Sequence, residues 1–211
     1  MNIRSDSKSI AILAIFTSLV IALEVFPIVG VTDLYTPVPN FTIDWTGIPI
    51  MIVFLGLGVV FSFFTIGVMW VFIAYRNFQG AAFKGLAEFF TIVGVVIARL
   101  LMRNRKVDWK QATLVYILFG CVSRGLGMLF GNTILLQFFY GLPVEAAYSL
   151  SLIYVPWNIL QALINIIGGI ILYNLIPESI RIQAGLDIYR ASTIHKYEEI
   201  SSIEIEAIDD E

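Results

Sequence analysis

The sequence has few of the residues from which catalytic and metal sites are commonly built. It contains one cysteine, Cys121, and one histidine, His195, and only 14% of its 211 residues are charged. A single cysteine excludes an intrachain disulfide and a zinc site built on cysteines. A single histidine in the polar C-terminal stretch argues against a histidine-based centre. We therefore expect no metal site, no catalytic residues and no enzyme activity.

Hydrophobic residues are abundant instead. They make up 58% of the chain, and the mean hydropathy is +0.86. In a soluble domain about a quarter of the residues are charged. The apolar residues here form blocks of roughly twenty, the length that crosses about 30 Å of hydrocarbon. This pattern predicts an all-α integral membrane protein, a multi-pass protein of the cell membrane.

The blocks predict six transmembrane helices. They cover about residues 9–29, 47–57, 59–76, 84–102, 112–139 and 150–176. The second and third come from the uncharged run 45–75, which we expect to break at Gly56 and Gly58, because a helix turns most easily at glycine. Ten of the thirteen Lys and Arg residues then lie on one face, so the positive-inside rule places both termini in the cytoplasm. A five-helix topology would separate these charges and is the weaker solution.

The chain divides into two parts. Residues 1–178 form the predicted six-helix membrane domain, and 179–211 form a predicted cytoplasmic acidic tail. Seven of the sixteen acidic residues lie between Glu198 and Glu211, so we expect this tail to be solvated and partly disordered. The first apolar block is longer than a signal-peptide core and lacks a small-x-small cleavage site, so we expect it to remain as a helix.

Several polar side chains fall inside the predicted helices, where they are costly and are candidates for function. They are Glu88, Arg124, Asn132, Gln137, Asn158, Gln161 and Asn165. Arg124 and Asn132 share one helical face, and Asn158, Gln161 and Asn165 form a second stripe. Interhelical hydrogen bonds would explain any one of them. The whole set, with aromatic residues nearby, favours a ligand pocket.

Two other functions stay open at this point. A carrier coupled to protons or ions and acting alone would use Glu88 and Arg124 as its titrating pair. Such carriers more often bury several acids, and here Glu88 is the one good candidate. A membrane assembly factor, which would have no ligand and no pocket, is the other alternative.

The first helix carries a face of small residues at helical spacing. It consists of Ala11, Ala14, Ser18 and Ala22. Small residues allow helices to approach closely within a membrane. Spacing alone is equally compatible with packing inside this chain and with docking to another membrane protein.

Two longer stretches resemble a known family. In "FTIDWTGIPIMIVFLGLGVVFS", an aspartate, a small residue and Ile-Pro lead into a helix that ends at a Leu-Gly turn. In "FGNTILLQFFYGLPVEAAYSLSLIYVPWNILQALIN", an asparagine precedes a Tyr-Gly loop and then Pro-aromatic-Asn. Together and in this order they resemble the substrate-binding S components of energy-coupling-factor (ECF) vitamin transporters, most closely the riboflavin-specific branch. The resemblance covers about residues 8–178.

The resemblance implies a vitamin-binding protein whose pocket lies near the outer face beneath the loop 31–44. It also implies three partners, a transmembrane coupling subunit and two cytoplasmic ATPases, and no nucleic acid. Ala14 and Ser18 fall where the family docks to the coupling subunit. No cofactor is implied beyond the ligand, which the resemblance indicates is riboflavin. The chain has no G-x-x-x-x-G-K-S/T motif for ATP, so energy must come from the partners.

The implied ligand contacts include Asn132, Asn158 and Gln161, but two positions depart from the family. The riboflavin branch has lysine at the position of Gln161, and glutamine loses that cation. Glu88 stands where a neutral amide is frequent. An S component for a different vitamin or small solute therefore stays open. The ligand-binding residues we expect are Asp44, Trp45, Glu88, Asn132, Tyr140, Trp157, Asn158, Gln161 and Asn165.

The short second helix fits this interpretation. Asp44 or Thr46 is expected to cap its N-terminus, with Pro49 tolerated in the first turn. Short or broken membrane helices mark binding sites in transporters, because irregular backbone is permitted where it lines a cavity.

Overall fold

The computed structural model describes residues 7–28, 30–39, 41–103, 107–184 and 186. Its elements in chain order are α1 (Ser7–Val25), β1 (Asp33–Tyr35), β2 (Thr42–Asp44), α2 (Gly47–Leu57), α3 (Val59–Arg76), α4 (Phe78–Met102), α5 (Trp109–Tyr140), α6 (Val144–Leu175) and α7 (Glu178–Ala184). The predicted helical membrane fold is confirmed.

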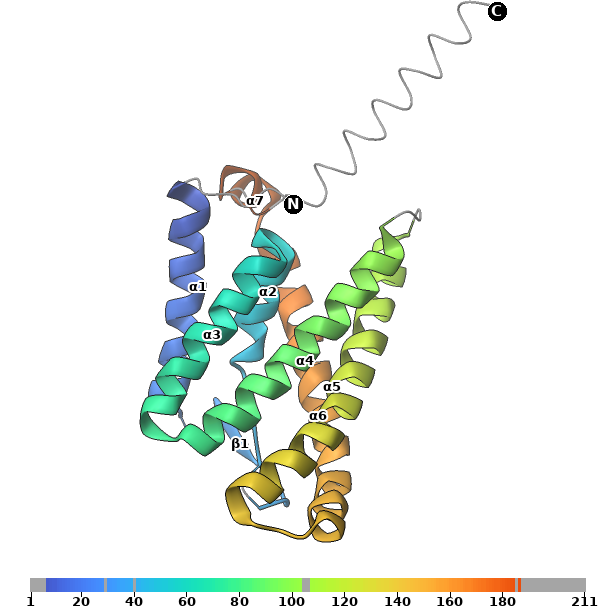
Figure 1. Cartoon of the computed structure of the whole chain (residues 1–211). Helices are drawn as coiled ribbons and strands as arrows, with labels where there is room; N and C mark the ends of the chain where they lie inside the picture. Colours follow the sequence, from blue (N-terminus) through green and yellow to red (C-terminus); the bar gives the residue numbers. More distant parts are fainter. Residues whose placement is uncertain (1–6, 29, 40, 104–106, 185, 187–211) are drawn as a thin grey trace, which may run out of the picture.

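The helices run up and down in sequence order. The start of α1 and the helix α7 lie at one end of the bundle, and the β1–β2 hairpin and the α5–α6 turn lie at the other (Figure 1). Five of the described helices, all except α2 and α7, are long and apolar enough to cross a membrane. With α2 as the sixth segment, the start of α1 and the end of α6 come to one side, which the charge pattern assigns to the cytoplasm. The chain is a multi-pass membrane protein.

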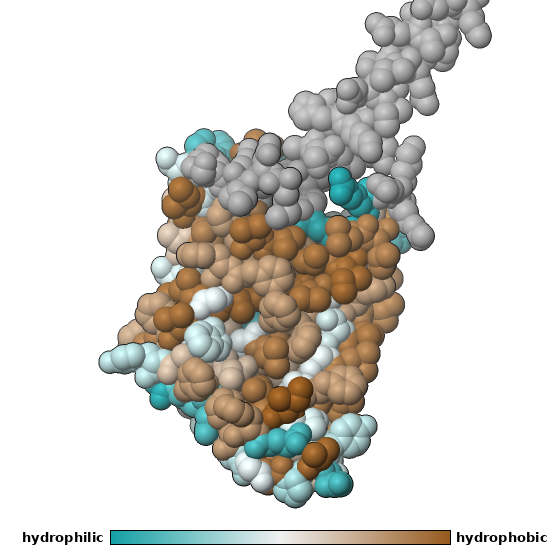
Figure 2. All heavy atoms as spheres, in the orientation of Figure 1, coloured by the Kyte–Doolittle hydropathy of each residue, from teal (hydrophilic) through white to brown (hydrophobic). Residues whose placement is uncertain are grey.

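The surface agrees with this placement. Hydrophobic side chains cover the middle of the face shown, and hydrophilic ones gather toward its two ends (Figure 2). The apolar side chains that α3, α4 and α5 expose, such as Phe72, Leu100 and Leu118, would meet lipid rather than water.

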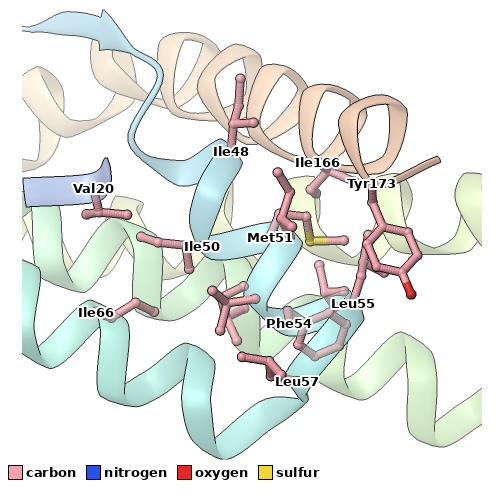
Figure 3. Close-up of a cluster of buried hydrophobic side chains, with 14 of the residues drawn as sticks. Val20, Ile48, Ile50, Met51, Phe54, Leu55, Leu57, Ile66, Ile166 and Tyr173 are labelled. Carbon is pink, nitrogen blue, oxygen red and sulfur yellow. The ribbon is translucent and has the colours of Figure 1, made fainter. Parts of the chain in front are cut away.

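α2 is the exception among the apolar helices because it faces no lipid. Its eleven residues span about 16 Å, roughly half the hydrocarbon thickness, and all eleven are buried. Side chains from α1, α3 and α6 surround it, including Val20, Ile66 and Ile166 (Figure 3). The uncharged run 45–75 is therefore apolar for two reasons. Its α2 part is buried in the protein core, and its α3 part exposes side chains to lipid.

The break between α2 and α3 lies at Gly58. Its backbone has φ +97° and ψ −175°, a conformation open almost only to glycine. Gly56, the other predicted breaking point, lies within α2 against Leu186. The predicted division into helices 47–57 and 59–76 is thus confirmed, with the break itself at Gly58 and with Leu186 packed on Gly56 inside α2.

The loop before α2 contains a small hairpin that the sequence did not indicate. β1 pairs antiparallel with β2, with Asp33 opposite Asp44 and Tyr35 opposite Thr42. Strands of three residues are too short to show an alternating pattern. The loop is tied to α6, since Tyr154 donates a hydrogen bond to the Pro39 carbonyl at 3.0 Å.

Two helices, α4 and α6, begin well before the apolar blocks predict. α4 begins at Phe78 rather than near residue 84, because the Asn77 side chain accepts a hydrogen bond from the Gly80 amide and caps the helix. α6 begins at Val144 rather than near 150, with Glu145 in its first turn, where a negative charge is favourable. Hydropathy alone misses such polar first turns.

The start of the predicted tail folds onto the bundle. α7 follows α6, and Leu186 is buried, with its carbonyl accepting a hydrogen bond from the Tyr173 hydroxyl at 2.8 Å. The Arg181 guanidinium lies over the Tyr173 ring. Residues 187–211 lie outside the described residues, so the disordered acidic tail stays a prediction.

Candidate functional site

A buried ion pair lies at the centre of the polar residues. Glu88 of α4 and Arg124 of α5 approach to 2.6 Å between Oε1 and Nη1, and the two residues are 1% and 4% exposed. Arg124 also donates from Nη1 to Thr91 at 3.1 Å and from Nε to Asn158 at 3.4 Å. A lone charge at this depth would be costly, so each of the two ions depends on the other.

Amide side chains of α6 extend this pair toward the hairpin. Asn165 Nδ2 donates to both Glu88 oxygens, at 3.0 and 3.2 Å. Gln161 Nε2 donates to Asn165 Oδ1 at 2.9 Å and to the Asp44 carbonyl at 2.6 Å, and Gln161 Oε1 accepts from the Asp44 amide at 3.1 Å. A continuous chain of hydrogen bonds therefore joins α5, α4 and α6 to β2.

The Asp44 carboxylate, at the hairpin end of this series of hydrogen bonds, forms an ion pair. It pairs with Lys84 of α4 at 3.0 Å, and Lys84 also pairs with Glu24 near the end of α1. Burial, and then the nearby Glu88 carboxylate, raise the pKa of Asp44 to about 6, although hydrogen bonds from Thr46 and the charge of Arg124 act against this rise.

The capping prediction for α2 fails for Thr46 and holds for Asp44. Thr46 is the N-cap residue, but its side chain makes no capping hydrogen bond. The Asp44 carboxylate, the other candidate, accepts hydrogen bonds from the Thr46 amide at the N-terminus of α2 and from the Thr46 hydroxyl. Pro49 lies in the first turn of α2 as expected.

Five of the nine predicted ligand residues come together in this network. They are Asp44, Glu88, Asn158, Gln161 and Asn165. The other four are outside it. Asn132 is 4% exposed and makes no side-chain hydrogen bond to a described residue, and Trp157 is half-buried. Trp45 donates to the Val31 carbonyl at 2.5 Å, and Tyr140 is exposed at the end of α5.

Three network residues were not among the predicted ligand contacts. In the sequence, Arg124 was noted only as a polar residue that shares a helical face with Asn132. Lys84 and Thr91 lie four and three residues from Glu88 on α4, a spacing that places all three on one helical face. That spacing could have linked Lys84 and Thr91 to Glu88. Lys84 was left out because it was the first residue of the predicted helix 84–102.

The small-residue face of α1 points away from the rest of the chain. Ala11, Ala14, Ser18 and Ala22 are all exposed, whereas the buried residues of α1 include Leu13 and Thr17. Packing inside the described part of this chain therefore does not account for the small residues.

Comparisons with known proteins bear on the fold. No protein-family model and no curated protein matches the chain. Among solved structures it is similar to one described as "the S-component for biotin from an ECF-type ABC transporter", with a TM-score of 0.54 and 19% sequence identity over 90% of this chain and 98% of that one. At this identity the match shows a shared fold. The fold that the sequence motifs indicated is thus confirmed, and the riboflavin branch is not.

The network can be tested where α2 meets α6. A Cβ on Gly47 would lie 1.8 Å from Asn165 Nδ2, so Gly47→Ala must displace the amide that binds Glu88 and Gln161. We expect the variant to lose about 1–3 kcal/mol of stability, measured by thermal unfolding in detergent.

Gly67→Ala is the matched control, since its Cβ would meet no atom within 4 Å and the site lies inside α3. We expect it to keep or slightly raise stability, because alanine is the better helix former. Equal unfolding temperatures for the two variants would contradict the described packing of Asn165.

Proposed function

We propose that this chain is the substrate-binding S component of an ECF-type importer and captures a vitamin from the outer side of the cell membrane. The observation that carries this is the chain of hydrogen bonds from the Glu88–Arg124 pair through Gln161 to Asp44. These hydrogen bonds lie beneath the hairpin in a fold shared with a known S component, which supports polar recognition of a ligand there. The chain itself binds and performs no chemical step.

The hairpin fits the role of a lid over such a site. It is held from below by the Gln161 side chain on the Asp44 backbone and from the side by Tyr154 on Pro39. Both contacts come from α6, the helix that also carries Asn158 and Asn165. Opening the hairpin would therefore expose the α6 stripe to the outer side.

Riboflavin is the first ligand we propose. Its flat ring system suits stacking on aromatic side chains, and the sequence offers Trp45, Tyr140 and Trp157 as candidates. In place of the lysine of the riboflavin branch, Gln161 holds the Asp44 backbone, so any cation that the ligand meets comes from another residue. Biotin is the second candidate, because the solved structure with this fold is an S component for biotin.

The proposed partners are a transmembrane coupling subunit and two ATPases. The exposed small-residue face of α1, which includes Ala14 and Ser18, offers a flat surface on which a partner helix can pack closely. Uptake that follows an ion gradient with no ATPase partner would instead indicate the stand-alone carrier.

Ligand binding is tested on the purified protein in mild detergent. We expect a co-purified flavin absorption band, or quenching of tryptophan fluorescence by riboflavin that saturates at one ligand per chain. If riboflavin gives no saturable quenching, biotin is titrated by calorimetry. Saturation by neither would contradict vitamin binding as proposed.

Docking is tested by co-expression with the coupling subunit and ATPases of an ECF transporter. Ala14→Trp and Ser18→Trp should abolish co-purification and leave ligand binding unchanged, because both side chains point away from the bundle. Leu19→Trp is the matched control on an exposed position outside the small-residue face. Co-purification of all three variants would contradict docking through this face.

A further inference from the structure

We infer that Lys84 links α1, the proposed docking helix, to the hairpin, so that a partner packing on α1 changes how firmly the hairpin is held. This inference rests on the proposed function and deepens it by naming two positioning residues, Glu24 and Lys84, which act through the hairpin. It follows from the ion pairs at the hairpin end of the bundle, to which the proposed ligand site assigns no role.

Lys84 lies between two carboxylates that come from different elements. Its ammonium group pairs with Glu24, the last residue but one of α1, and at 3.0 Å with Asp44, the last residue of β2. The three side chains are between 10% and 21% exposed. Partly buried pairs are screened by salt less than exposed ones. One lysine of α4 thus joins the end of α1 to the hairpin.

The end of α1 receives a second basic side chain. Arg76, the last residue of α3, donates from Nη2 to the Glu24 carbonyl at 2.8 Å. Arg76 and Lys84 are the two basic residues that the six-helix topology places in the outer loops, against the positive-inside bias. Both of them contact Glu24. The outer basic residues therefore fix this end of α1.

The rest of α1 is less firmly packed than the helix that carries Lys84. Nine of the 25 residues of α4 are buried, against four of the nineteen residues of α1. Segments with few buried contacts shift at lower cost than well-packed ones. A partner helix that packs closely on Ala14 and Ser18 would therefore move α1 more easily than α4. Such a movement would carry Glu24 relative to Lys84.

Sharing one ammonium makes the contacts of the two acids compete. The lysine charge is compact and sits on a flexible stem, so each carboxylate draws it toward itself. Where Glu24 moves away, the ammonium is left to Asp44 and the hairpin is held more firmly. Where Glu24 moves closer, the pair between Lys84 and Asp44 weakens. The position of α1 thereby controls the hairpin.

The first measurement is hydrogen exchange of the β1 and β2 backbone amides, followed by mass spectrometry on ligand-free protein. Glu24→Gln leaves Lys84 to Asp44, so these amides should exchange about threefold more slowly. Lys84→Met leaves two acids near each other without their cation, so exchange should be about threefold faster. Glu145→Gln is the matched control, because this exposed acid in the first turn of α6 forms no ion pair with a described residue. It should exchange like the wild type.

The same measurement on the complex with the coupling subunit and ATPases tests the link itself. Docking should change hairpin exchange about fivefold or more in the wild type and in Glu145→Gln. In Glu24→Gln and Lys84→Met the change should shrink to less than about twofold, because the shared ion is gone. A merely structural role of the ion pairs would leave the effect of docking intact.

The outcomes separate this inference from the proposals beneath it. Exchange that shifts in the same direction in Glu24→Gln and Lys84→Met would overturn the inference. So would a wild-type hairpin that ignores docking, or an undiminished docking effect in both variants. Failure of the wild type to co-purify with the partners would overturn docking and this inference together. Absence of vitamin binding would overturn the proposed ligand alone, because the exchange measurement uses ligand-free protein.

Discussion

The ion pair between Glu88 and Arg124 is the interaction on which the rest of the polar interior depends. Either ion alone at membrane depth would be strongly destabilising, so the pair fixes α4 against α5. The Glu88 carboxylate also accepts from Asn165, and the Arg124 guanidinium also donates to Asn158 and Thr91. Asn165 in turn accepts from Gln161 and so positions it. The hairpin is held on Gln161 through the Asp44 backbone. A contact between two helices thereby determines where an outer loop lies.

The short, fully buried α2 is the second constraint. α2 has only eleven residues, and the β1–β2 hairpin directly precedes it in the chain. Gly47 at its first position lets Asn165 approach, and Gly58 at its end lets the chain reverse into α3.

Much of this was accessible from the sequence, and the exceptions have physical reasons. Long apolar blocks identify membrane helices because lipid demands them, and the break at Gly58 was visible because glycine alone suits that backbone. Glu88, Gln161 and Asn165 stood out because polar side chains are rare at such depth. Which of these groups bond to each other depends on the packing of α4 against α5 and α6, and no spacing rule reveals that. The Asp44–Lys84 contact joins segments distant in sequence, so it too needed the structure.

The most direct test of this account is a double-mutant cycle on Glu88→Ala and Arg124→Ala, with unfolding free energy measured in detergent. Each single variant should lose about 3–5 kcal/mol, because it leaves an uncompensated buried charge. The double variant should lose clearly less than the two losses combined. Losses that add to within about 0.5 kcal/mol would show that the two residues are independent, and would contradict the central place given to this pair.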